Sequence, residues 1–278
     1  PPLQSHLLPL HSGALAAALD AGRFSEIAPK AGRAFWRNDE EGLREVANSC
    51  AVADPQRVAA STAAGEEMRR RLGHYLGAML HFEGEWTWGV DRLHFLVARL
   101  KSSGLLDDGA ALPGVLHETG ETIVPTTGQR HRIDFFASLR SPYTYLAAAR
   151  VRRLAERSGA ELRIRYVMPM VMRGLPVPTP KRLYIVLDAK REAERLGLPF
   201  GRICDPVGAG AERGIAVLAH ASARGQGAQF LESFLAGVFA EGIDAASDRG
   251  LHAIAARAGL SSDAVRAALV DESWRTVA

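Results

Sequence analysis

The spacing of apolar residues changes along the chain. Residues 13–100 carry mostly helical periodicity, with a non-helical stretch near 78–88. Residues 105–130 have no helical period and are rich in Gly, Pro, Thr and Asp, which predicts a linker. Residues 181–278 return to helical spacing over several segments. We therefore expect two mostly helical regions on either side of a linker.

The segment that follows the linker has the pattern of a strand, a helix and a strand. An apolar run at 133–136 is typical of a short strand, and residues 161–167 alternate charged and apolar side chains, as in a half-buried strand. Between them, residues 147–155 place apolar side chains on one helical face, and Gly159 supplies a stop. Such a segment of about 35 residues predicts a βαβ unit with parallel strands.

The chain also contains an internal repeat. Residues 35–61 align with residues 239–269, and residues 66–72 align with residues 272–278. The repeating unit is about 205 residues long, so a chain of 278 residues holds parts of two units. We expect either a fragment of a tandem two-unit protein or a permuted arrangement in which the tail of one copy completes the head of the other.

Composition narrows the class of protein. Hydrophobic residues make up 47% of the chain, enough for a sizeable core. The 34 basic and 31 acidic residues nearly balance, with a net charge of +3, which gives no reason to expect nucleic acid as a partner. No apolar stretch approaches the roughly 18 residues of a membrane span, and the first residues do not resemble a signal peptide. We expect a cytoplasmic protein without a membrane partner.

The cysteines and histidines form no recognisable site. Cys50 and Cys204 lie far apart and form no CxxC pair, so neither a disulfide scaffold nor a dithiol redox site is predicted. His74, His81 and His94 lack the spacing of metal ligands, so no metal site is predicted.

The stretch SLRSPYTYLA, residues 138–147, contains the main candidate for chemistry. Ser141 followed by Pro142 is typical of a helix N-cap and first helical residue. A thiolate at the same position would face unsatisfied N–H groups and the positive end of the helix dipole. The serine hydroxyl would add a donor and lower the pKa of a bound thiol from its usual value of about 8.5. Both interpretations of Ser141, a structural cap and a catalytic hydroxyl, stay open.

Three segments together resemble a known family. They are IDFFASLRSPYTYLA, LPVPTPKRLYIVLDAKREAERLGLPF and FEGEWTWGVDRLHFL. In order and spacing they are similar to DsbA-like thioredoxin-fold proteins, specifically the 2-hydroxychromene-2-carboxylate isomerases and kappa-class glutathione transferases. Within the second segment, Tyr184 and Asp188 lie one helical turn apart and are expected to support the helix rather than react.

The resemblance implies an α/β fold that is mostly helical overall. Its thioredoxin-like core consists of a βαβ unit plus closing strands and a helix, with a large helical insertion. Residues 1–104 would be the C-terminal part of a first DsbA-like unit, with helical insertion, closing strands and last helix. Residues 105–130 would be the linker, and residues 131–278 the N-terminal part of a second unit.

The resemblance also implies a glutathione-dependent isomerase or transferase. Ser141 corresponds to the serine that contacts the glutathione sulfur, and Tyr143 follows it in the Ser-Pro-Tyr element. Lys181 would pair with a carboxylate of glutathione or substrate, or be an exposed first-turn lysine. Asp91 would hold the γ-glutamyl amine, or be an N-cap or a partner of Arg92. The partners would be a small thiol and an aromatic or unsaturated carboxylate, with a homodimer as one assembly.

Some positions depart from the family pattern. Ser141 and Thr144 stand where the cysteines of CxxC would be, which excludes thiol–disulfide exchange by the protein itself. Met79 falls near the position of the family's cis-proline, and Val90 replaces the serine of the kappa-class Ser-Asp pair. These departures indicate an alternative: a non-catalytic DsbA-like tandem scaffold, or a protein that binds a small thiol or a partner with a degenerate site.

Overall fold

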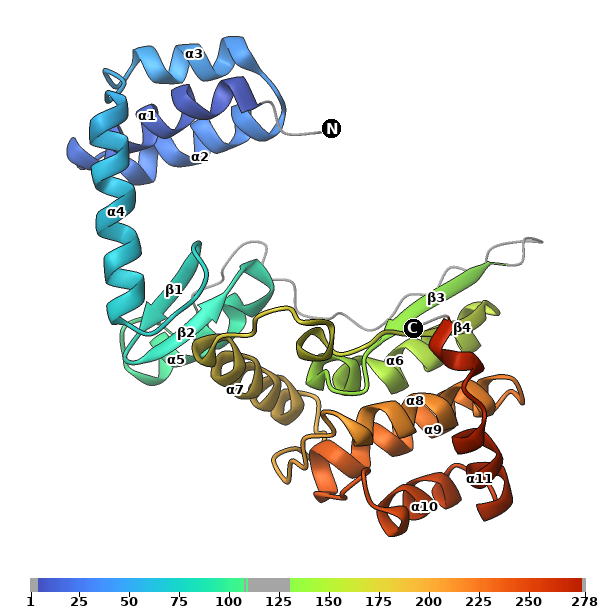
Figure 1. Ribbon diagram of the computed structural model, residues 1–278. Helices are drawn as coiled ribbons and strands as arrows, with labels where there is room; N and C mark the ends of the chain where they lie inside the picture. The colour runs from blue at the N-terminus through green and yellow to red at the C-terminus, as the bar shows by residue number, and fades with distance from the viewer. Residues whose placement is uncertain (1–4, 108, 110–130, 277–278) are drawn as a thin grey trace. The chain divides into compact units, whose positions relative to one another are not determined.

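The computed structural model describes residues 5–107, 109 and 131–276 (Figure 1). Contacts within the chain divide it into two compact units, Pro1–Gly89 and Val90–Ala278. No helix in the described part of the chain is long and apolar enough to cross a membrane.

The predicted linker, residues 105–130, falls outside the described residues except for 105–107 and Gly109. Helix α5 (Leu93–Ser102) was expected to end the first unit, within residues 1–104, but it groups with the second unit. The assignment of these parts to two DsbA-like units stays a prediction.

The first unit is a group of helices followed by an antiparallel hairpin. Its elements are η1 (Ser5–Leu7), α1 (Leu8–Asp20), α2 (Phe24–Trp36), α3 (Glu40–Asn48), α4 (Pro55–Arg71), β1 (Met79–Phe82) and β2 (Glu85–Trp88). The hairpin is the non-helical stretch predicted near 78–88. Its first residue, Met79, pairs with Trp88.

The second unit contains a parallel strand pair and most of the remaining helices. Its elements are η2 (Val90–Arg92), α5, β3 (Arg132–Ala137), α6 (Pro142–Ser158), β4 (Glu161–Tyr166), η3 (Met170–Arg173), α7 (Thr179–Arg195), α8 (Ala209–Ser222), α9 (Gly227–Ala236), the π-helix η4 (Gly237–Glu241), α10 (Asp248–Arg257), α11 (Ser262–Val270) and η5 (Ser273–Thr276).

The predicted βαβ unit is confirmed. Strands β3 and β4 pair in parallel, from Arg132 opposite Glu161 to Ala137 opposite Tyr166, and α6 connects them. Gly159 ends α6 with φ 66, a left-handed conformation that glycine adopts without steric cost.

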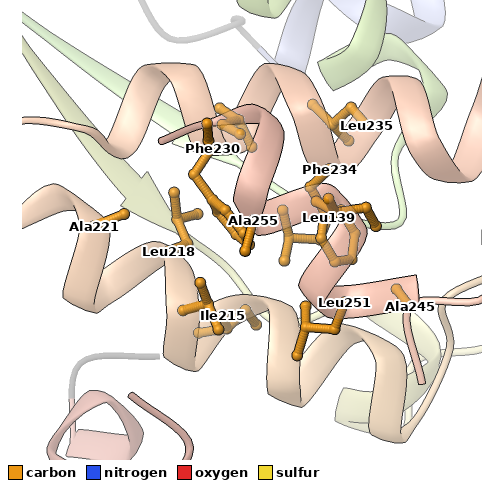
Figure 2. Close-up of a cluster of buried hydrophobic side chains, with 14 of the residues drawn as sticks. Leu139, Ile215, Leu218, Ala221, Phe230, Phe234, Leu235, Ala245, Leu251 and Ala255 are labelled. Carbon is orange, nitrogen blue, oxygen red and sulfur yellow. The ribbon is translucent and has the colours of Figure 1, made fainter. Parts of the chain in front are cut away.

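The core of the second unit lies between its helices (Figure 2). From α8, Ile215 and Leu218 point into the cluster, and from α9, Phe230 and Phe234 do the same. Leu139, just after β3, is fully buried among them. Burying one such side chain contributes about 1.5–3 kcal/mol. Leu139 therefore anchors the turn that leads from β3 into α6.

Helices α1–α4 and α8–α11 share their order and their contacts. In each set the first helix contacts the other three, and the second contacts the third. Asp39 caps α3 by accepting from the Gly42 N–H at 2.9 Å, and Ser247 caps α10 by accepting from the Gly250 N–H at 3.1 Å. The leucine after each glycine is fully buried. This shared local structure supports the alignment of the repeated segments, while the larger tandem protein stays a prediction.

Candidate functional site

Ser141 lies at the start of α6. Its backbone is extended, with φ −94 and ψ 116, and its Oγ accepts a hydrogen bond from the Thr144 N–H at 3.3 Å. Its own N–H donates to the Ser138 carbonyl at 3.1 Å, and Pro142 is the first helical residue. The interpretation of Ser141 as an N-cap is therefore confirmed, for the local reasons that the sequence offered.

A cap and an anion site can coexist at this residue. Accepting from Thr144 uses a lone pair of the Ser141 oxygen, and the hydroxyl hydrogen can serve a second partner. The first amides of α6 point in the same direction as the positive end of its dipole. Thr144 itself is buried at the position of a second CxxC cysteine.

A pocket of about 460 Å³ includes Ser141. It is formed by the β3–α6 turn, the segment after β4, the first half of α7, and residues near 203–205 and 239. Its residues are Ser138, Arg140, Ser141, Pro142, Tyr143, Val167, Met168, Pro169, Met170, Arg173, Val177, Lys181, Arg182, Ile185, Val186, Ile203, Asp205 and Phe239. The N-cap of α6 thus lies in a cavity of ligand size.

Cationic side chains outnumber anionic ones around this pocket. Arg140 is paired with Asp205 by two hydrogen bonds of 2.7 and 2.6 Å, and the hydrogen bond to Asp205 raises the pKa of Arg140. Arg173, Lys181 and Arg182 add three further positive charges to the lining. The excess of positive charge favours an anionic ligand.

The rest of the lining is largely apolar. Met168 follows β4, Ile185 comes from α7, and Phe239 comes from the π-helix η4. Phe239 is held by stacking on Tyr145 and Phe200, with ring centroids 6.0 and 6.1 Å away. A π-helical turn shifts the side chains of a helix out of regular register, and such turns are frequent at functional sites. The pocket can therefore accept an apolar or aromatic group beside its cations.

A second pocket has a volume of about 310 Å³. Residues from η2, α5, α6 and α7 form it: Asp91, Arg92, His94, Tyr143, Leu146, Ala147, Arg150, Glu192, Arg195 and Leu196. Tyr143 is the residue that both pockets share. The lining carries both signs of charge, which suits a ligand end with an amine and a carboxylate.

The predicted site residues divide between these pockets. Ser141, Tyr143 and Lys181 lie around the first pocket, whereas Asp91 lies in the second. Arg92 donates through Nη1 to Asp91 Oδ2 at 2.8 Å, so Asp91 is also the partner of Arg92 that the alternative interpretation expected. Met79, near the expected cis-proline position, belongs to the first unit.

A buried carboxylate adjoins Tyr143. The Tyr143 hydroxyl donates to Asp188 Oδ2 at 2.8 Å, and Arg92 Nε donates to both Asp188 oxygens at 3.1 and 3.2 Å. Burial and the charge of Asp188 raise the pKa of Tyr143 above its ordinary value. For Arg92, burial acts against the charge, but the carboxylates of Asp188, Glu192 and Asp91 together outweigh it and raise its pKa.

Sequence reasoning missed several residues of these pockets. Arg92 was seen only as a neighbour of Asp91, although it belongs to the same Trp-Gly-x-Asp-Arg element. Arg173 and Arg182 were not singled out because isolated exposed arginines carry no local signal of a site. Among the described residues, no group of three or more His, Cys, Asp or Glu side chains is arranged to hold a metal ion.

Comparisons with known proteins add the family context. Residues 132–276, just over half of the chain, match the model of the DSBA-like thioredoxin domain family. Among solved structures, a 2-hydroxychromene-2-carboxylate isomerase is 23% identical, with 51% of this chain and 73% of that chain covered and a TM-score of 0.42. The cytosolic disulfide reductase DsbM from Pseudomonas aeruginosa is 21% identical, with 52% and 73% covered and a TM-score of 0.42. No curated protein matched the sequence.

Proposed function

Because the chain belongs to the DSBA-like thioredoxin domain family, with the thioredoxin-like fold expected from its sequence, we propose that the Ser141 pocket binds glutathione. The reaction is a glutathione-dependent isomerisation or transfer on an apolar, unsaturated or aromatic carboxylate. One observation carries the proposal: Ser141 caps α6 inside a cavity of about 460 Å³ that has an excess of cationic side chains.

The thiol would lie at the N-terminus of α6. There the free amides, the helix dipole and the Ser141 hydroxyl each favour the thiolate over the thiol. A thiolate is the nucleophile in thiol chemistry, so a lowered pKa raises the reactive fraction at neutral pH. In an isomerisation, the thiolate adds to a carbon of a conjugated double bond, and the electron pair of that double bond moves to the conjugated carbonyl group. Rotation then occurs about the former double bond, and the returning electron pair re-forms the double bond and expels the thiolate. Glutathione is regenerated, and the serine takes no part in redox exchange.

The carboxylates of glutathione and substrate would meet the cations of the pocket. Arg173, Lys181 and Arg182 can pair with them, and the two arginines can form bidentate contacts. Met168 and Phe239 would contact the apolar part of the substrate. Holding the two reactants together in this way supplies the proximity that an addition reaction needs.

Asp91 would receive the γ-glutamyl amine in the second pocket. A glutathione molecule bound in this way has its thiol beside Ser141 and its γ-glutamyl end beyond Tyr143. The exposed Asp91 carboxylate uses one oxygen for Arg92 and can offer the other. Arg150 and Arg195 line the same pocket and can receive the γ-glutamyl carboxylate.

The placement of Asp91 also favours a second candidate function. Ser141 and Asp91 line different pockets, and Asp91 is already paired with Arg92. A non-catalytic DsbA-like protein that binds a small thiol or a partner would need only one of the two pockets. Binding without turnover would favour this alternative.

Calorimetric titration with glutathione tests the proposal. Ser141→Ala should weaken binding about tenfold, since it removes a hydrogen bond to a charged group. It should also cost about 1 kcal/mol of stability through the lost cap. Ser247→Ala is the matched control, because Ser247 caps α10 outside both pockets. It should cost similar stability and leave glutathione affinity unchanged.

Two results would contradict the proposal. The first is no heat of binding for the wild-type protein at millimolar glutathione. The second is an equal loss of affinity in Ser141→Ala and Ser247→Ala, which would assign the effect to capping alone. Binding without isomerisation or conjugation across a panel of unsaturated aromatic carboxylates would favour the non-catalytic alternative.

A further inference from the structure

One buried carboxylate connects both pockets. Asp188, on α7, is 1% exposed. It accepts from the Tyr143 hydroxyl at 2.8 Å and from Arg92 Nε at 3.1 and 3.2 Å. Tyr143 is in α6 and Arg92 is in η2, so Asp188 ties three segments together.

Two further donors occupy the same carboxylate. The Tyr184 hydroxyl and Arg191 Nη2, both on α7, lie 3.4 Å from Asp188 Oδ1. A carboxylate has about four lone-pair sites, and four donor groups surround this one. The oxygens of Asp188 are therefore already engaged by donors of the protein, and its role is to hold these neighbours.

On the side of Ser141, Asp188 holds Tyr143 through the hydrogen bond from the Tyr143 hydroxyl. Donation to Asp188 fixes the direction of the Tyr143 hydroxyl and keeps its ring in the wall that both pockets share. Tyr143 is two residues after Ser141, in the first turn of α6. Any rotation of this ring changes the shape of the cavity beside the serine hydroxyl.

Towards the second pocket, the group that Asp188 holds is Arg92. The same guanidinium that binds Asp188 through Nε binds Asp91 through Nη1, at 2.8 Å. The Asp91 side chain is 71% exposed, so this contact is its main restraint in the second pocket. The contacts run in sequence from Tyr143 to Asp188, then to Arg92, and then to Asp91.

We propose that Asp188 is a positioning residue that sets the two ends of the ligand site, holding Tyr143 beside Ser141 and, through Arg92, holding Asp91. This inference rests on the proposed binding of glutathione for its functional meaning. It assigns to Asp188 a role beyond the support of its own helix, because three of the four residues in the chain of contacts line the pockets.

Asp188→Asn removes the negative charge of the side chain and keeps its volume almost unchanged. An asparagine accepts hydrogen bonds through one oxygen only. Its NH₂ group is a donor, so it cannot accept from the groups that donated to the second carboxylate oxygen. The Tyr143 hydroxyl and Arg92 therefore compete for a single acceptor. Glu232→Gln is the matched control, because Glu232 accepts from Arg152 on α6 at 2.6 Å and lies outside both pockets.

The first measurement needs no ligand. Ultraviolet titration of tyrosine ionisation, with the spectrum of Tyr143→Phe subtracted, follows Tyr143 alone. We expect the pKa of Tyr143 to lie above its ordinary value of 10.0 in the wild type and in Glu232→Gln, and to move back towards 10.0 in Asp188→Asn. An unchanged titration in Asp188→Asn overturns the proposal.

The second measurement compares two thiols. N-acetyl-cysteinylglycine lacks the γ-glutamyl amine that Asp91 would bind. Asp188→Asn should weaken glutathione binding about tenfold, and Tyr143→Phe should add nothing further in that background because the two changes remove one interaction. Arg92→Lys keeps the charge but lacks the forked geometry for both carboxylates, so it should weaken glutathione more than N-acetyl-cysteinylglycine.

The outcomes separate the two proposals. If the wild type binds no glutathione, the proposed function fails, while the Tyr143 titration still decides whether Asp188 holds that residue. If Asp188→Asn does not fold, the comparison of the two thiols in Arg92→Lys still tests whether Arg92 positions Asp91 in the second pocket. Equal effects of Arg92→Lys on the two thiols overturn the proposal.

Discussion

Ser141 illustrates how one side chain can serve both the fold and a ligand. Its oxygen accepts from the Thr144 N–H, as an N-cap does, and its hydroxyl hydrogen can serve a bound anion. The cap could be predicted from the Ser-Pro dipeptide because capping depends on residues within one helical turn. The pocket around Ser141 depends on residues from distant segments, and the dipeptide contains no information about them.

The thiol pKa of a cysteine placed at residue 141 would report the electrostatic potential at the N-terminus of α6. In a background with Cys50→Ser and Cys204→Ser, we expect the pKa of the thiol in Ser141→Cys to fall below about 8.5, because the N-terminus of α6 stabilises the thiolate. The rate of alkylation by iodoacetamide as a function of pH measures it. Ser158→Cys, at the last residue of the same helix, is the control. Equal thiol pKa values at the two ends would contradict the prediction.

Close packing beneath the site predicts a sharp difference between two glycines. A Cβ on Gly214 would lie 2.4 Å from Phe234 Cε2 and 2.7 Å from Leu139 Cδ1. Gly214→Ala should therefore destabilise the protein by about 1–3 kcal/mol through overpacking. At Gly32, in α2, an added Cβ would meet no atom within 4 Å. Gly32→Ala should therefore stabilise the protein by about 0.5–1 kcal/mol. Urea unfolding measures both, and a loss of stability in Gly32→Ala equal to that in Gly214→Ala would contradict the packing argument.

At the scale of elements, periodicity located most of the secondary structure. The two strands around α6 follow from local patterns of apolar residues, and the interruption of helical spacing near 78–88 located the stretch that forms the hairpin. The short helix η2 and the π-helix η4 had no such signal, since each is defined by one turn of backbone. These two elements nevertheless bring Arg92 and Phe239 to the pockets.

The contact between η2 and α7 predicts a large stability effect. Arg92→Ala should cost about 3 kcal/mol, because it removes a half-buried partner of the buried Asp188 carboxylate. Arg191, also near Asp188, keeps the loss at the lower end of the range for such pairs. Arg163→Ala removes an exposed pair with Glu161 and should cause no measurable change. Chemical unfolding compares them, and equal effects would show that the Asp188 contact does not stabilise η2.

For the whole molecule, one buried and two half-buried histidines predict acid sensitivity. Burial lowers the pKa of His11, His74 and His220 below the ordinary value of 6.5. The folded protein therefore binds these protons less tightly than the unfolded chain. Their contribution to stability is complete above pH 6.5 and is lost as the pH falls below it.

The free energy of unfolding in urea at a series of pH values measures this effect. His74→Gln should flatten the fall in stability below pH 6.5, because His74 is buried and its replacement cannot take up a proton. His131→Gln is the same substitution at an exposed position and serves as the comparison. An unchanged profile in His74→Gln would exclude His74 as a source of the acid sensitivity.

The linear sequence was sufficient for those features that depend on neighbouring residues. The βαβ unit, the non-helical stretch near 78–88, the cap at Ser141 and the motifs of the DSBA-like family are all of this kind, because helical and strand periods and capping act over a few positions. The contents of the pockets were decided by tertiary structure. Arg92 and Asp188 are 96 positions apart and Tyr143 and Asp188 are 45 apart, so no local pattern could show that one carboxylate binds both. Packing of α6, α7 and η2 in three dimensions places these groups together, and it puts Ser141 and Asp91 in two different pockets that share Tyr143.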